Sequence, residues 1–226
     1  MPTQWGTDVT GVNTRLDTTD PIMALSFDAC GGIHGSGVDQ ALIDLLNQEQ
    51  LAATLFLNER WIDANPQVTD SLIANPLFEI ANHGTHHKPL SVTGRSAYNI
   101  AGCASAAEVI DEVESNHHRL TALLGHPPTF FRSGTSYYDE IGAAIVTALG
   151  EIPVSFAING DAGGSFSVAQ IGRALAEPPP GAIVLMHMNQ PHRSTARGLA
   201  VALPALRARG TRFVTLSGAH LPAAHS

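Results

Sequence analysis

Seven short apolar segments, separated by stretches of helical periodicity, constrain the fold of this chain more than any other feature. They are Ile22–Phe27, Ala53–Leu57, Phe78–Ala81, Pro128–Phe131, Pro153–Ile158, Ala182–Met186 and Arg212–Leu216. Short apolar runs of this kind are typical of buried strands, and their alternation with helices is typical of parallel sheets. We therefore predict an α/β fold, a distorted (β/α) barrel of about seven parallel strands that forms a single domain over residues 21–226, behind a polar arm over residues 1–20.

The stretches between these segments carry apolar residues at helical spacing. The predicted helices are Val38–Leu46, a segment that begins at Asn65–Pro66, Ala106–Leu124, a segment that begins at Asp139, Ile171–Ala176 and Arg197–Arg209. Ser36 is the predicted N-cap of the first. His117 and His118 are adjacent, so they do not face one site, and we expect them in a solvated turn near the end of their helix.

The acidic balance of the chain argues against nucleic acid as a partner. Its formal net charge is −8, and its Lys and Arg residues form no run. No apolar segment approaches the roughly 18 residues that a membrane span needs. With only two cysteines, Cys30 and Cys103, there is no disulfide framework, although one bridge between them is allowed. The oligomeric state is left open.

Histidines cluster directly after the third apolar segment. His83, His86 and His87 fall within five residues. If the chain forms a helical turn after Asn82, the spacing of four places the His83 and His87 imidazoles on one face, near enough to hold one metal ion. His86 would then point elsewhere.

Other polar side chains also follow apolar segments. Asp28 follows the first, Arg132 follows the fourth, Asp161 follows the fifth and His187 follows the sixth. In parallel barrels, reacting groups gather where the strands meet the loops that follow them. We therefore expect these four side chains to lie close to the histidine cluster.

Together these segments resemble the motifs of the polysaccharide deacetylases, carbohydrate esterases with a NodB homology domain that remove N-acetyl groups from chitin, peptidoglycan and related sugars. Leu25–Asp28 is similar to the first motif and His83–Leu90 to the second. Phe131–Gly134 resembles the third, without its usual proline and tyrosine pattern. Asp161 is similar to the acid of the fourth, without the neighbouring tryptophan, and Leu185–His187 resembles the fifth.

The resemblance implies metal-assisted hydrolysis of an amide on an N-acylated sugar or glycan, at an extracytoplasmic location. Asp28 would be the general base, and Arg132 would orient it and keep it ionised. His187 would donate a proton to the leaving amine, and Asp161 would favour its imidazolium form.

The resemblance also implies a divalent metal ion, expected to be zinc, on His83 and His87. The family's second Asp, a metal ligand, is replaced here by Ala29, and a catalytic zinc normally keeps three protein ligands. The open replacements are Asp28, His34 or His86, and weaker metal binding or none. Cys30 is a further candidate, either as a ligand or as a nucleophile.

Two other functions are compatible with the same residues. One is hydrolysis of a different non-peptide C–N bond, in a formamide or a cyclic amide. The other is a non-catalytic glycan-binding pseudoenzyme that kept the fold and lost the ligand at Ala29. Release of a free amine from each substrate type would separate these functions.

Overall fold

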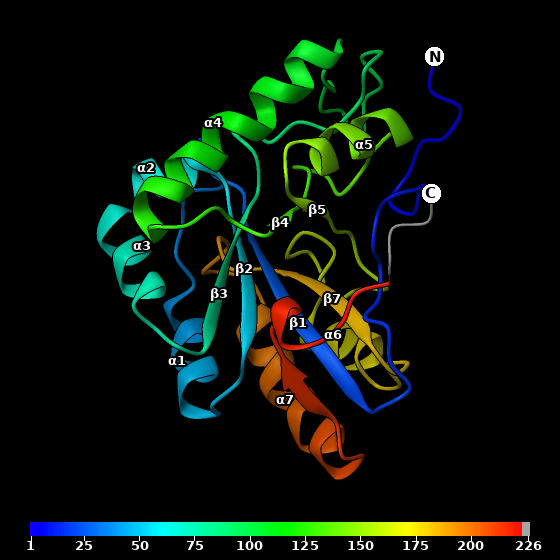
Figure 1. The fold of residues 1–226 in the computed structure, drawn as a ribbon. Coiled ribbons are helices and arrows are strands. Elements are labelled where there is room, and N and C mark those ends of the chain that lie inside the picture. The colour runs from blue at the N-terminus through cyan, green and yellow to red at the C-terminus, as the bar shows by residue number, and fades with distance from the viewer. Residues whose placement is uncertain (223–226) are drawn as a thin grey trace.

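The computed structural model, which describes residues 1–222, contains one curved sheet of eight parallel strands (Figure 1). Their order is β5-β4-β3-β2-β1-β7-β6, and β8 pairs with β1. The bounds are β1 Ile22–Ala29, β2 Ala53–Leu57, β3 Phe78–Asn82, β4 Phe130–Phe131, β5 Ile152–Pro153, β6 Ile158–Asn159, β7 Ala182–His187 and β8 Arg212–Val214. The distorted (β/α) barrel predicted from the sequence is confirmed.

The fifth apolar segment is not one strand, and that prediction was wrong. It divides into β5 and β6, which lie at opposite ends of the strand order. The residues between them change partner: the Val154 amide donates to the Phe131 carbonyl at 2.8 Å, and the Ala157 amide donates to the Ile183 carbonyl at 2.9 Å. A segment that bonds β4 at its start and β7 at its end cannot form a single ladder, and it links the two edges of the sheet instead.

Within residues 1–222, seven α-helices cover the outside of the strands (Figure 1). They are α1 Gln40–Gln48, α2 Glu59–Ala64, α3 Pro66–Ile73, α4 Ala106–Leu124, α5 Glu140–Ala148, α6 Val168–Ala174 and α7 Thr195–Ala208, followed by a short 3₁₀ turn, Leu216–Gly218. The first begins after Asp39, whose carboxylate accepts from the Leu42 amide, and not after Ser36, whose hydroxyl donates to the Gly32 carbonyl. Within residues 1–222 no helix is both long and apolar enough to cross a membrane.

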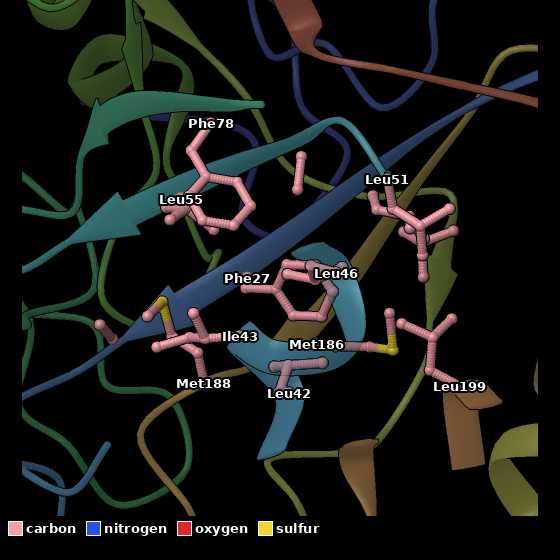
Figure 2. Packing of buried hydrophobic residues seen from close by; sticks show 14 of the residues in the cluster. Phe27, Leu42, Ile43, Leu46, Leu51, Leu55, Phe78, Met186, Met188 and Leu199 are labelled. Atoms are coloured by element: carbon pink, nitrogen blue, oxygen red, sulfur yellow. The ribbon is translucent and has the colours of Figure 1, made fainter. Parts of the chain in front are cut away.

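Alternation along β1 separates two environments. Phe27 and Ala29 belong to the buried cluster between the sheet and the helices α1 and α7, where Leu42 and Met186 also pack (Figure 2). The intervening Asp28 bonds Arg132 on the other face, inside the barrel. Since successive side chains of a strand point to opposite faces, β1 fixes the direction of Asp28 by burying its apolar neighbours.

The N-terminal arm lies against the barrel. The Gly6 amide donates to the Tyr138 carbonyl at 3.1 Å, the Asn13 amide to the Pro153 carbonyl at 3.0 Å, and the Leu16 amide to the Gly181 carbonyl at 2.8 Å. Two apolar side chains of the arm, Val9 and Leu16, are buried. These contacts attach the arm to β5, to the segment between β4 and α5, and to the residue that precedes β7.

A buried polar network lies between α4 and β3. Nδ1 of His117 is 2.7 Å from Oε1 of Glu151, which also accepts from Nδ2 of Asn82 at 2.8 Å. His117 thus lies within α4 and contacts a buried carboxyl group, contrary to the solvated turn expected from the sequence. Burial raises the pKa of Glu151 to about 8, although the Asn82 hydrogen bond lowers it.

This raised pKa predicts a pH-dependent stability. A carboxyl group whose folded-state pKa is about 8, against 4.5 for the free side chain, stabilises the fold fully below pH 4.5, and the contribution is lost as the pH rises through 8. We expect Glu151→Gln, which cannot ionise, to flatten the decline of the wild-type melting temperature between about pH 5 and pH 9. Thermal unfolding followed by circular dichroism at several pH values would test this, and parallel curves for the two proteins would contradict it.

Candidate active site

Strand register brings the predicted residues of β1 and β7 together. Asp28 and His187 are direct partners in the parallel pairing of these two strands, so their side chains leave the sheet on the same side. Arg132 directly follows β4, and its amide donates to the carbonyl of Asn82 at the end of β3. The carboxyl ends of four strands therefore converge on one region, as the sequence predicted.

Asp28 and Arg132 form a buried ion pair. Nη1 of Arg132 donates to Oδ1 of Asp28 at 2.8 Å, and Nη2 donates to the Ser26 hydroxyl and the Ser155 carbonyl, both at 2.9 Å. The guanidinium group also lies 4.1 Å from the centre of the Phe56 ring. Arg132 is fully buried, and these contacts fix it so that its charge faces the carboxylate.

The surroundings of Asp28 keep it ionised. Burial alone would raise the pKa of this carboxyl group, but the charges of His83, Arg132 and His187 and the Arg132 hydrogen bond together lower it. Arg132 occupies Oδ1, whereas Oδ2 lies 3.6 Å from Nε2 of His83. One carboxylate oxygen is therefore held by the arginine, and the other faces the histidine cluster.

His187 and the buried Asp161 form a second pair. Oδ1 of Asp161 is 2.9 Å from Nδ1 of His187, while Oδ2 accepts from the His187 amide at 2.8 Å and from the Thr195 hydroxyl at 2.9 Å. Burial lowers the pKa of His187, but the hydrogen bonds to Asp161 and Cys30 and their charges raise it well above its usual value. With Nδ1 bound to Asp161, Nε2 is the nitrogen left for other contacts.

His83 and His87 lie together, with ring centres 5.0 Å apart and the rings nearly perpendicular. Nδ1 of His83 donates to the Arg132 carbonyl at 2.9 Å, so Nε2 is the ring nitrogen that faces Asp28 and Cys30. Nε2 of His87 is buried and has no hydrogen-bond partner among the described residues. Cys30 completes the cluster, because one ligand atom from each of these three side chains lies within 4.8 Å of the others.

The loop that carries the histidines is not helical, contrary to the geometry that we expected. Residues 83–90 follow β3 as an irregular segment, and His87 has a left-handed φ of +61°. Glu112 of α4 holds this loop by accepting from the His86 amide at 2.9 Å and the Lys88 amide at 3.1 Å. Gly134 packs so closely that an added Cβ would lie 2.2 Å from the carbonyl carbon of His87.

Glu112 and Gly134 were therefore missed by the sequence reasoning. One signal was present for Glu112: it lies on the buried stripe of α4, where Val109, Val113 and Leu120 are apolar. An acid on such a stripe needs a buried partner, and the amides of the histidine loop supply it. No local pattern marks Gly134, because its role depends on a contact between distant loops.

Other candidates from the sequence lie outside the cluster. His34 and His86 are exposed, and neither belongs to the group of potential metal-binding side chains. Neither Cys30 nor Cys103 forms a disulfide. Of the side chains proposed to replace the missing ligand, Asp28 and Cys30 are the two that face His83.

A cavity of about 340 Å³ opens beside these pairs. Asp28, His87 and His187 contribute to its wall, so groups from both halves of the site reach the same space. The rest of the lining is largely small or apolar: Tyr98, Ile100, Gly134, Thr135, Ser136, Phe156, Asn159, Ala162, Gly163 and Leu185. The cavity is large enough for a small organic group and is lined by a few convergent polar side chains, which is typical of ligand sites.

Comparison with known proteins identifies a matching family and solved structures with a similar fold. A sequence profile described as polysaccharide deacetylase matches residues 15–151. A peptidoglycan N-acetylglucosamine deacetylase bound to a naphthyl N-hydroxybenzamide has a TM-score of 0.77 at 20% identity, covering 93% of each chain. A cobalt complex of a family 4 acetyl xylan esterase from Clostridium thermocellum has 0.69 at 21%, covering 87% of this chain and 88% of the other. A family 4 pseudoenzyme from Bacillus anthracis has 0.74 at 16%, covering 94% and 68%.

Proposed function

We propose that this chain, which belongs to the polysaccharide deacetylase family, removes N-acetyl groups from a sugar or polysaccharide such as a chitin oligosaccharide or peptidoglycan. Family membership makes it a hydrolase of C–N bonds other than peptide bonds. The observation that carries the proposal is the pairing of Asp28 with Arg132 and of His187 with Asp161, with Asp28 and His187 both reaching one cavity.

A divalent metal ion, with zinc as the proposed identity, fits the residues of the histidine loop. The buried, unpartnered Nε2 of His87 is an atom that a metal ion would satisfy. The Arg132 carbonyl accepts a hydrogen bond from Nδ1 of His83 and so fixes the orientation of the ring. Metal-binding histidines are commonly oriented by such an acceptor. We assign His83 and His87 as ligands, and the cobalt complex of the related esterase supports a divalent ion in this fold. When bound, such an ion supplies a Lewis acid that polarises the reacting groups.

Asp28 serves as the general base. Its Oδ2 accepts a proton from the attacking water, while Oδ1 stays bonded to Arg132. The lowered pKa of Asp28 keeps the carboxylate ionised and therefore able to accept, although it limits the strength of the base. Arg132 acts through Asp28, because it is fully buried and absent from the cavity wall.

His187 serves as the general acid. An amine anion is too poor a leaving group to depart without a proton, and the raised pKa of His187 keeps the imidazolium form available to donate from Nε2. Asp161 accepts from Nδ1 and so fixes the ring and its charge. Asp28 and His187 come from neighbouring strands, so the base and the acid act on one amide group from adjacent positions.

An exposed aromatic side chain at the cavity supports a sugar substrate. Tyr98 is 68% exposed and lines the cavity, and its ring packs edge-on against Tyr137 at 5.5 Å between centres. Tyr98 and Asn99 both have left-handed φ angles in a tight turn closed by the bridge between Ala97 and Ile100. The turn keeps a large apolar ring at the surface, where the apolar face of a sugar could pack on it. An N-acylated glycan outside the cytoplasm is the substrate class that we propose.

Tyr98→Ala is expected to raise KM for a chitin oligosaccharide by about 2- to 10-fold, with little change in kcat. The ring would contribute equally to binding of the substrate and of the transition state, because Tyr98 is an exposed residue of the cavity wall with no assigned role in proton transfer. Tyr98→Phe is the matched control and should retain the wild-type KM. A fall in kcat at unchanged KM for the alanine variant would contradict a binding role.

The proposed function is tested by amine release. Purified protein supplied with zinc is incubated separately with N-acetylglucosamine oligosaccharides, with peptidoglycan, and with formamide and cyclic-amide substrates, and the free amine is measured. Amine release from the N-acetylated sugars is expected. Release only from the formamide or the cyclic amide would show that the protein hydrolyses a different C–N bond. Glycan binding without any release would identify a pseudoenzyme, like the one from Bacillus anthracis with a similar fold.

A further inference from the structure

The direction of the side chains at the end of β1 decides which residue can complete the metal site. Ala29 is fully buried and belongs to the apolar cluster on the helix side of the sheet, together with Phe27. Asp28 faces the opposite side, where it contacts Arg132 and His83. Cys30 follows at the next position of the alternation and returns to the side of Asp28, where its Sγ lies 3.9 Å from Nε2 of His83.

The three side chains around this point are spaced like the ligands of one ion. Two ligand atoms on a tetrahedral zinc lie about 3.3–3.6 Å apart, given Zn–N bonds of about 2.0–2.1 Å and Zn–S bonds of about 2.3 Å. The ligand atoms of Cys30, His83 and His87 lie within 4.8 Å of one another, so side-chain shifts of about an ångström or less would bring them to this spacing. The unpartnered Nε2 of His87 belongs to the same group.

We infer that the Cys30 thiolate is the third protein ligand of the metal ion, in a Cys-His-His site with His83 and His87. This inference rests on the proposed function for the two histidine ligands and goes beyond it in the third. The thiolate takes the place of the carboxylate that position 29 lacks, and metal binding releases the thiol proton to solvent. Asp28 then stays outside the ligand set and keeps Oδ2 for the attacking water.

A thiolate ligand changes which ions the site prefers. Soft sulfur ligands favour zinc and cobalt over magnesium and manganese, which prefer oxygen ligands. The fully buried Cys103 belongs to no group of three potential metal-binding side chains among the described residues and lies in a separate apolar cluster. It therefore serves as an internal reference for every thiol measurement on Cys30.

Cobalt spectroscopy tests the third ligand directly, without an activity assay. Metal-free protein is titrated with Co²⁺, and the near-ultraviolet thiolate-to-cobalt charge-transfer band is recorded. The band is expected for the wild type and for Cys103→Ser, and it should be absent for Cys30→Ser, with cobalt affinity lowered about 100-fold or more. Cys30→Asp supplies a carboxylate from the same position and should recover much of the affinity without the band.

Alkylation gives an independent measurement. Iodoacetamide should label Cys30 in the metal-free protein, and zinc should protect it, while the buried Cys103 stays unlabelled in both states. Cobalt binding without a charge-transfer band, unchanged affinity in Cys30→Ser, or equal labelling with and without zinc would each overturn Cys30 as a ligand. An acyl group trapped on Cys30 during turnover would also overturn it and identify a nucleophile. None of these outcomes prejudges amine release, which tests the proposed function separately.

Discussion

Asp28→Asn is expected to lower kcat for amine release by about 100- to 10,000-fold, the range that a positioned general base contributes. The asparagine amide keeps the shape of the side chain but cannot accept a proton from water. The neighbouring groups stay in place, because His187 is held by Asp161, and His83 by the Arg132 carbonyl. We expect KM to change much less than kcat, since the base acts in the transition state.

The same substitution leaves the buried Arg132 charge without its carboxylate, which destabilises a fold by about 3–5 kcal/mol when a buried pair is broken. Rates must therefore be expressed per folded molecule, with the folded fraction taken from circular dichroism. Asp70→Asn, at an exposed position of α3, is the matched control and should leave kcat unchanged. Wild-type turnover in folded Asp28→Asn protein would show that Asp28 is not the general base. Glycan binding without turnover, in both the wild type and the variant, would indicate that the protein is a pseudoenzyme.

The strand ends could be predicted because their causes are local. Apolar runs mark buried parallel strands, and a parallel sheet brings the ends of those strands to one side. The positions of Asp28 and His187 at strand ends follow directly from this reasoning. The structure adds the register in which β1 and β7 pair, which places the two residues side by side. Arg132 and Asp161 were placed on the same side for the same reason, and the structure brings each of them to the partner that the resemblance implied.

The histidine loop could not be predicted in the same way. The spacing of His83 and His87 suggested a helical turn, but the loop is irregular, and contacts from other elements determine its shape. Glu112 binds the loop amides from α4, and Gly134 admits His87 in a left-handed conformation. Such contacts join residues far apart in the sequence, so no local pattern reports them.

The role of Cys30 lies between these cases. The alternation that directs Asp28 into the barrel also directs Cys30 there, provided that the extended chain continues beyond Ala29. The sequence alone left open where β1 ends, and the apolar run was predicted to stop at Phe27. In the structure β1 extends to Ala29. Because of this extension, the Ala29 side chain lies in the core and the Cys30 side chain lies at the proposed metal site.

Ala29→Asp tests that distinction and is expected to lower the free energy of unfolding by about 3 kcal/mol or more. Position 29 is where the family usually has a metal-binding Asp, so alignment alone would predict a restored site. The structure predicts the opposite, because the Ala29 methyl is fully buried in the apolar cluster with Phe27 and Trp61 and a carboxylate there would have no partner.

Urea unfolding and zinc titration of Ala29→Asp measure the two consequences together. Ala29→Ser is the control for size and polarity, since a small hydroxyl can bond to a nearby backbone carbonyl, and it should be destabilised far less. The aspartate variant should bind zinc no more tightly than the wild type, because the new carboxylate faces the helices α1 and α7 while the histidines lie across the sheet. A stable variant with tighter zinc binding would show that the side chain at position 29 faces the metal. The alternation of side chains along β1, on which the assignment of Cys30 as a ligand depends, would then be wrong.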